Sequence, residues 1–110
     1  YLGGSISSGV AMRYGALHSF TAKLPLLEKK AAFALIGKST ESAIHSGVLQ
    51  GVFSEIDGVI DKYKDQFTDL TIILIGGDAD FLQDRLKNDI FANSNFLLEG
   101  LNYILELNKD

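Results

Sequence analysis

Cysteine is absent from this sequence of 110 residues, which excludes disulfide bonds, thiolate metal ligands and a cysteine nucleophile. Histidine is scarce, and its two copies, His18 and His45, are too few for a metal site built from several histidines. The apolar runs are shorter than the ~20 residues that a membrane-spanning helix needs. We therefore expect no membrane partner, and the missing cysteines fit a cytoplasmic location.

Basic residues are few and scattered. Lys and Arg number 10 against 14 Asp and Glu, which gives a formal net charge of -4. No basic group exceeds a pair such as Lys29-Lys30, whereas nucleic-acid binding needs a patch that neutralises phosphates. We therefore expect no nucleic-acid partner. Apolar residues make up 46% of the chain and charged residues 22%, a balance typical of a globular domain.

The first residues differ from the usual start of a protein. The sequence opens at Tyr1 without a methionine and enters an apolar, glycine-rich segment at once. It has neither the basic start nor the long apolar stretch of a signal peptide. We interpret the chain as part of a longer protein whose chemistry lies partly on the other portion.

Helices and strands are predicted to alternate along the chain, which indicates an α/β fold. Apolar spacing predicts a helix from Val10 to Leu24, ended by Pro25, and a long helix from about Thr40 to Phe67. The other predicted elements are a strand end in residues 1–6, a connector at 26–35, a loop at 36–40, a buried parallel strand at Thr71–Ile75, a helix at Asp80–Asn88, a loop at Ile90–Asn95, a short strand at Asn95–Leu97 and a last helix at Leu98–Leu107.

The start of the long helix is rich in hydroxyl groups. Ser39 or Thr40 is expected to be the N-cap, with Glu41 in the first turn, where the helix dipole favours a carboxylate. Ser39 and Ser42 have the spacing of a capping box, but Ser42 is not the usual Glu or Gln, so no box is predicted.

Glycines recur along the long helix. At about 100° per residue, Thr40 and the three glycines project within roughly 40° of one another. Each glycine costs ~1 kcal/mol relative to alanine, so the pattern indicates close approach of another group. Two interpretations stay open: packing on a partner subunit or ligand, or packing on the chain's own sheet. The three glycines are Gly47, Gly51 and Gly58.

Gly76, Gly77 and Asp78 stand between the predicted strand and the next helix. Ligands bind at the carboxyl ends of strands in open α/β sheets. Glycines there let a backbone approach a nucleotide, and a helix start offers free N–H groups. Asp78 would accept from a sugar hydroxyl. The alternative is a plain turn in which Asp78 is the N-cap.

The remaining titratable residues are expected to be structural or solvated. His18 and His45 are predicted at the surface or its boundary rather than as bases. Asp57 and Asp61 lie one helical turn apart, a spacing that suits a cation, but neighbouring lysines favour a solvated charged face. We therefore predict no metal site in this chain.

Several motifs, taken in chain order, resemble the C-terminal half of the type III pantothenate kinase family. Each motif alone is short, but their order and spacing extend over almost the whole sequence. The matching motifs are Gly3-Gly4-x-Ile6-x-x-Gly9, Ala16-Leu17, Thr21-Ala22-x-Leu24-Pro25, Ile36-Gly37-x-x-Thr40-x-x-Ala43-Ile44-x-x-Gly47, Gly51, Ile56-Asp57-Gly58, Gly76-Gly77-Asp78-Ala79, Leu97 and Gly100-Leu101.

The resemblance implies a partial second ribonuclease-H-like domain of the acetate and sugar kinase, Hsp70 and actin superfamily. Residues 1–110 would be the C-terminal half-domain of a two-domain, homodimeric kinase whose N-terminal domain is absent from this chain. That enzyme would use ATP with Mg²⁺ and a monovalent cation, K⁺ or NH₄⁺, to phosphorylate pantothenate in coenzyme A biosynthesis.

The family's general base, first phosphate motif and cation ligand all precede the matched segment. The resemblance therefore implies no catalytic residue here, and this segment alone is expected to be inactive. Two alternatives stay open. One is a non-catalytic nucleotide-binding or dimerisation module of the same fold, and the other is half of another enzyme of the sugar-kinase type.

The resemblance also assigns roles to residues. Thr40 matches a threonine that contacts pantothenate, and Gly76 and Gly77, with Asp78 beside them, match the adenosine-side glycine pair. Ser8 and Ile75 depart from the family pattern, which usually has proline and threonine there. The positions implied to line the cleft are Gly3, Gly4 and Ile6.

Overall fold

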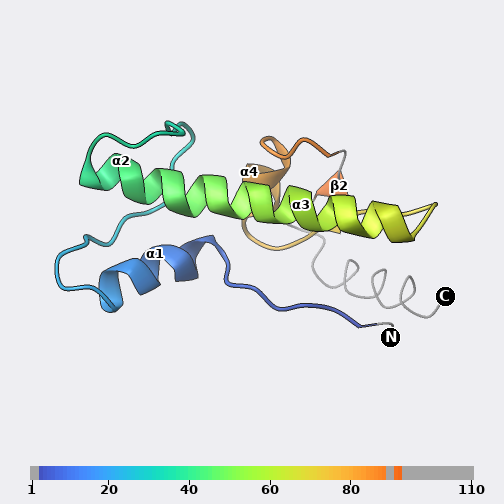
Figure 1. Cartoon of the computed structure of the whole chain (residues 1–110), viewed down its shortest axis with the longest axis horizontal. Helices are drawn as coiled ribbons and strands as arrows, with labels where there is room; N and C mark the ends of the chain where they lie inside the picture. The colour runs from blue at the N-terminus through green and yellow to red at the C-terminus, as the bar shows by residue number, and fades with distance from the viewer. Residues whose placement is uncertain (1–2, 89–90, 93–110) are drawn as a thin grey trace. The chain divides into compact units, whose positions relative to one another are not determined.

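The computed structural model describes residues 3–88 and 91–92 (Figure 1). The first four described elements are helical, and the predicted alternation of helices and strands is confined to the last three, β1, α4 and β2. The elements in chain order are α1 at Val10–Ser19, α2 at Thr40–His45, the π-helical turn η1 at Ser46–Gln50, α3 at Gly51–Gln66, β1 at Ile73–Leu74, α4 at Ala79–Gln83 and β2 at Phe91–Ala92.

The chain divides into two compact units. The helical unit comprises Ser7–Ile56, and the sheet unit comprises Tyr1–Ile6 together with Asp57–Asp110. The long helix formed by α2, η1 and α3 continues from the first unit into the second.

The core of the helical unit forms where α1 packs against η1 and its neighbouring turns (Figure 1). α1 contributes Val10 and Tyr14 to this core, and Leu49 is its most buried side chain. Burial of such apolar side chains is the main force that holds the two helices together. The buried residues of the long helix in this unit are Ile44, His45, Val48, Leu49, Val52 and Phe53.

α1 begins where it was predicted but ends earlier. Its N-cap is Gly9, which has no side chain to form a cap bond. The predicted extension to Leu24 is wrong, because two side chains form hydrogen bonds with backbone carbonyls at and beyond the end of α1. The Thr21 hydroxyl donates to the Leu17 carbonyl, and His18 Nδ1 bonds the Leu24 carbonyl at 2.9 Å. These local bonds favour a turn over a further helical turn.

The long helix has almost the predicted extent, Thr40–Gln66, but it is not regular. In η1 the turn widens, so that four residues span less than one turn there. The apolar spacing of a regular helix predicts that Val59 and Tyr63 lie on the buried side with Val48 and Val52, but the side chains of Val59 and Tyr63 are 39% and 42% exposed. Ile60 is buried instead.

The sheet unit contains a parallel pair of short strands. β1 pairs with β2 in the register Ile73 with Phe91 and Leu74 with Ala92. The predicted strand at Thr71–Ile75 is thus confirmed in position and parallel direction. It is shorter than predicted, and its residues are half-buried rather than buried.

Other predictions for the sheet unit are wrong. β2 lies within the segment predicted as a loop, and residues 3–6 form no strand. α4 is shorter than the predicted helix because the backbone amides of Lys87 and Asn88 donate to the Asp57 carboxylate rather than to helical carbonyls. The predicted strand at 95–97 and helix at 98–107 lie outside the described residues.

We predict that two glycines respond oppositely to substitution by alanine. A Cβ at Gly37 would lie 2.4 Å from the backbone of Ala43, whereas one at Gly58 would meet no described atom within 4 Å. Gly37→Ala should therefore lower the free energy of unfolding by about 1–3 kcal/mol. Gly58→Ala should raise it by up to ~1 kcal/mol, because alanine favours a helix interior.

Urea unfolding followed by circular dichroism measures both changes. Gly58→Ala is the matched control for the general effect of adding a methyl group. Equal stability of Gly37→Ala and the wild-type protein would contradict the close approach at Gly37.

Candidate functional site

The loop before the long helix is closed by a capping box. Ser39 is the N-cap, and its Oγ accepts a hydrogen bond from the Ser42 amide at 3.1 Å. In return Ser42 Oγ accepts from the Ser39 amide at 2.9 Å. The prediction of no capping box is therefore wrong. The short serine side chain at the third helical position makes the bond that Glu or Gln usually makes.

Thr40 is the first residue of the helix and does not cap it. Its side chain is exposed, and within the described part of the chain its hydroxyl makes no hydrogen bond. Of the two residues expected as the N-cap, Ser39 is the one that caps the helix. The hydroxyl stays free to donate to or accept from a ligand, so its role as a substrate contact stays a prediction.

Gly76 and Gly77 form an open backbone turn after β1. Gly76 has φ +111°, which favours glycine, and a Cβ at either position would meet no described atom within 4 Å. Asp78 occupies the N-cap position of α4, but its side chain makes no cap bond. The alternative interpretation, a turn in which Asp78 is the N-cap, is therefore correct in position, although the side-chain cap bond is missing. The turn leaves room for a ligand beside the backbone.

The segment Gly3–Ile6 is exposed and contains no helix or strand. Gly3 has φ +132°, and the Ile6 side chain is fully exposed, at 103%. The predicted site residues fall into two groups. Gly3–Ile6 and Gly76–Asp78 belong to the sheet unit, whereas Thr40 belongs to the helical unit.

A charged cluster that sequence reasoning missed ties α1 to α3 in the helical unit. Arg13 forms an ion pair with Glu55, and Ser7 Oγ donates to Glu55 Oε1 at 2.6 Å. Arg13 Nε also donates to the Ser8 carbonyl at 2.8 Å. The Ser7 hydrogen bond, followed by Arg13, lowers the pKa of Glu55. These partners are far apart in the sequence, so no local pattern indicates them.

His45 is buried, which corrects its predicted position at the surface or boundary. Its Nδ1 lies 2.7 Å from the hydroxyl of Tyr14, and the two rings meet edge to face. Burial raises the pKa of Tyr14, so the phenol stays protonated at neutral pH. Its hydroxyl can therefore donate a hydrogen bond to His45 Nδ1. His45 is thus a core residue with a satisfied ring nitrogen. His18 is exposed, as predicted.

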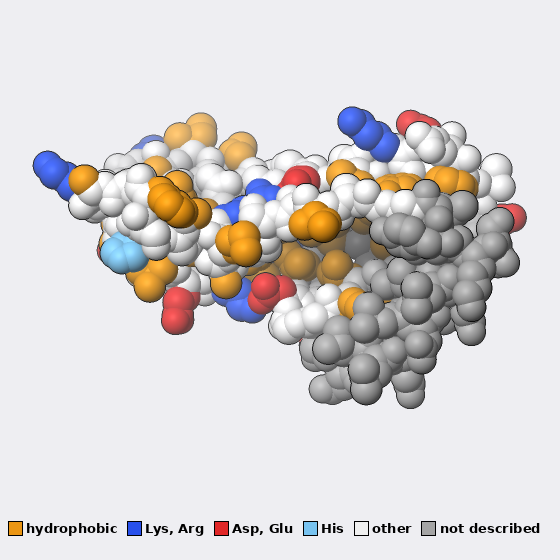
Figure 2. All heavy atoms as spheres, turned by 90° about the horizontal axis from the view of Figure 1, so that it is seen from below, with side chains coloured by type: hydrophobic (Ala, Val, Ile, Leu, Met, Phe, Trp, Pro, Cys, Tyr) orange, Lys and Arg blue, Asp and Glu red, His pale blue; other side chains and the backbone are white. Residues whose placement is uncertain are grey.

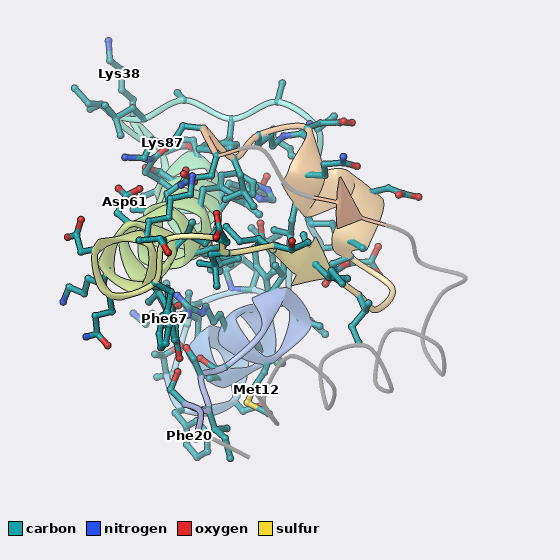
Figure 3. The ribbon with its side chains drawn as sticks, turned by 90° about the vertical axis from the view of Figure 1, so that its right-hand side faces the viewer. Met12, Phe20, Lys38, Asp61, Phe67 and Lys87 are labelled. Atoms are coloured by element: carbon teal, nitrogen blue, oxygen red, sulfur yellow. The ribbon has the colours of Figure 1, made fainter. Side chains whose placement is uncertain are left out.

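Asp57 and Asp61 bind a neighbouring segment of the sheet unit. Lys87 Nζ donates to Asp61 at 2.6 Å (Figure 3), and the Lys87 amide and Asn88 Nδ2 donate to Asp57 at 3.0 and 2.9 Å. The Lys87 hydrogen bond lowers the pKa of Asp61, and the same bond raises the pKa of Lys87. Among residues 3–88 and 91–92, no three His, Asp or Glu side chains gather in a way that suits a metal ion.

The glycines of the long helix make no close contact with the described residues that would explain their spacing. A Cβ at Gly47 or Gly58 would meet no atom of the described residues within 4 Å, and one at Gly51 would lie 3.7 Å from Arg13 Nη1. Gly47 lies in η1, so the angular alignment predicted for a regular helix holds only for Gly51 and Gly58, both in α3. Packing against another molecule stays a prediction.

Apolar side chains are exposed at several places on the face seen in Figure 2. The most exposed of them besides Ile6 are Phe20 at 87% and Ile36 at 72%. No helix of the described residues has both the length and the apolar character needed to cross a membrane.

Comparisons with known proteins match most of the chain. The profile of the family described as Type III pantothenate kinase matches residues 1–62. A Type III pantothenate kinase of Christiangramia forsetii is 60% identical over 99% of this chain and 45% of its own length. A Type III pantothenate kinase of Flavobacterium johnsoniae is 59% identical over 92% of this chain and 41% of its own length. The chain thus spans less than half the length of these relatives.

We predict that the Arg13–Glu55 cluster stabilises the protein only while Glu55 is ionised. Because folding lowers the pKa of Glu55, its contribution is present above the ordinary glutamate pKa of about 4.3 and is lost as the pH falls through the lower folded value. Glu55→Gln should lower the free energy of unfolding by about 0.2–1 kcal/mol at pH 7. The difference should vanish near pH 3.

Urea unfolding at the two pH values measures this difference. Glu28→Gln removes the same charge from the exposed connector and serves as the control. A difference between Glu55→Gln and wild type that is equal at both pH values would show that the carboxylate charge contributes nothing.

Proposed function

The chain belongs to the type III pantothenate kinase family, and from this membership we propose that it is the C-terminal part of an enzyme that uses ATP to phosphorylate the hydroxyl of pantothenate. The product would be 4'-phosphopantothenate, in the first step of coenzyme A biosynthesis. The observation that carries the proposal is 60% identity to such an enzyme over 99% of this chain. Because the relatives are about twice as long, the activity is proposed for a full-length enzyme, and this segment alone is expected to be inactive.

The family implies the general fold of the actin, Hsp70 and sugar kinase superfamily. We assign residues 1–110 more narrowly to the second ribonuclease-H-like domain, as its C-terminal half. The alternation of helices and strands and the parallel pairing of β1 with β2 support this assignment.

Thr40 is proposed to bind pantothenate. Three features support this role: the side chain is exposed, its hydroxyl has no hydrogen bond to the described residues, and the capping task belongs to Ser39. A free hydroxyl at a fixed helix start can recognise a polar group of the substrate as donor or acceptor.

Gly76, Gly77 and Asp78 are proposed to contact the nucleotide. The positive φ of Gly76 and the open space beside both glycines support a close approach of ATP to the backbone. The exposed segment Gly3–Ile6 is proposed to line the cleft.

Phosphoryl transfer depends mainly on positioning the two substrates and neutralising charge in the transition state. A bound Mg²⁺ would supply part of that charge neutralisation. The described residues contain no group of three acidic or histidine side chains that suits a metal ion, and the Asp57 and Asp61 carboxylates bind Lys87 and Asn88. We therefore place the ligands of Mg²⁺ and of the monovalent cation, and the general base, in the rest of a cytoplasmic, homodimeric enzyme.

The substrate role of Thr40 predicts a selective kinetic defect. In the full-length enzyme, Thr40→Val should raise the Michaelis constant for pantothenate or lower turnover by roughly 3- to 100-fold, because a substrate group loses its partner. The Michaelis constant for ATP should change little. Steady-state assays with each substrate varied in turn measure this split.

Ser39→Ala is the matched control, because it removes the cap and should cost about 1 kcal/mol of stability. Thr40→Val should leave the melting temperature nearly unchanged, because Thr40 does not cap the helix. Unchanged pantothenate saturation in Thr40→Val would remove Thr40 from the substrate site.

The proposed homodimer predicts an effect at Gly58. This residue has open space around it in the single chain, so leucine there should not disturb the fold of one subunit. If the face of α3 that bears Gly51 and Gly58 meets the partner subunit, Gly58→Leu overpacks the interface and produces monomers. Sedimentation equilibrium measures the mass, with Gly58→Ala as the small-residue control. A dimer of unchanged mass in Gly58→Leu would place the interface elsewhere.

A further inference from the structure

The hydroxyl of Ser42, a half-buried serine, has an unusual number of hydrogen-bond partners. It accepts hydrogen bonds from the amides of Lys38 and Ser39, both at 2.9 Å. It also lies 2.8 Å from Ser39 Oγ and donates to the Ser39 carbonyl at 3.2 Å. An ordinary capping box ties the residue at the third helical position to one amide, that of the N-cap. Ser42 therefore fixes the orientation of two successive peptide units just before Thr40.

Two further contacts hold the same loop. The backbone of Gly37 lies so close to that of Ala43 that a Cβ would be 2.4 Å away. The Ser46 hydroxyl donates to the Leu35 carbonyl. The loop is thus attached to the first turns of the helix at three successive points.

The three hydroxyls at this helix start are therefore used differently. Those of Ser39 and Ser42 are engaged with the backbone and with each other, whereas that of Thr40 has no partner among the described residues. The Lys38 side chain extends away from the ribbon, so it is the Lys38 amide that joins this network (Figure 3).

We propose that Ser42 is a positioning residue for pantothenate recognition, because its hydroxyl holds the Lys38–Thr40 backbone in the one arrangement that presents the Thr40 hydroxyl to the substrate. The inference rests on the proposed role of Thr40. A contact residue held in place beforehand loses less conformational freedom when the ligand binds, so its hydrogen bond contributes more to binding.

The test uses the full-length enzyme and compares substrates. Ser42→Ala should raise the Michaelis constant for pantothenate about 3- to 10-fold, the range that one lost neutral hydrogen bond produces, and leave that for ATP within about 2-fold. Ser42→Thr keeps the hydroxyl and should restore the wild-type value. Ser42→Cys keeps the shape but is a weak acceptor, so it should show the defect even if Ser42→Ala folds poorly.

Ser54→Ala is the matched control, because Ser54 is an exposed serine of the same helix whose hydroxyl accepts a hydrogen bond from Gln50, one turn earlier in that helix. It should leave both Michaelis constants unchanged. The double variant Thr40→Val, Ser42→Ala should be no worse for pantothenate than Thr40→Val, because positioning has no effect once the contact is gone.

The outcomes separate this inference from the function on which it rests. If Thr40→Val leaves pantothenate saturation unchanged, the proposed substrate role fails. If Thr40→Val weakens pantothenate use but Ser42→Ala and Ser42→Cys do not, or if they affect both substrates equally, Ser42 is only a capping residue and the inference is overturned. The inference would also be overturned if the double variant raised the Michaelis constant for pantothenate by the product of the two single effects.

Discussion

Burial of one face of the long helix against α1 is the constraint on which the helical unit depends. This face contains Leu49, which is fully buried, and it also contains His45. Each large apolar side chain removed from water contributes ~1.5–3 kcal/mol. A histidine in such a face needs a hydrogen-bond partner, because an unpaired polar group costs free energy when it is buried. Tyr14 supplies that partner, and the bond also fixes which residues of the two helices face each other.

The widened turn η1 follows from the same constraint. It includes Val48 and Leu49, both buried, so it lies where the packing of the long helix is most complete. A π-helical turn is rare because its backbone geometry is less favourable than that of an α-helix, and dense packing offsets this cost. Farther along the helix, in α3, Ile60 is buried whereas Val59 is exposed.

Periodicity predicted the parts of this fold that depend on a repeated apolar pattern. The long helix and the position of β1 were predicted correctly because the spacing of their apolar residues is a local property of the sequence. The errors arose where one side chain bonds a distant or neighbouring backbone group. Thr21 shortens α1 and Asp57 ends the α4 segment through such bonds, and neither follows a periodic pattern. The ion pair of Arg13 with Glu55 was missed for the same reason.

The candidate site shows the same limit at the level of single hydroxyl groups. Ser39, Thr40 and Ser42 carry the same chemical group within four residues, so the sequence alone cannot say which one caps the helix and which one is left over. The backbone decides, because the N-cap and the third helical position are the places from which a short side chain reaches the free amides. Ser39 and Ser42 occupy these places, so only the hydroxyl of Thr40 remains for another molecule. A residue that recognises a ligand needs a group that the fold does not use, and here the fold leaves that group on the residue that the family resemblance identifies.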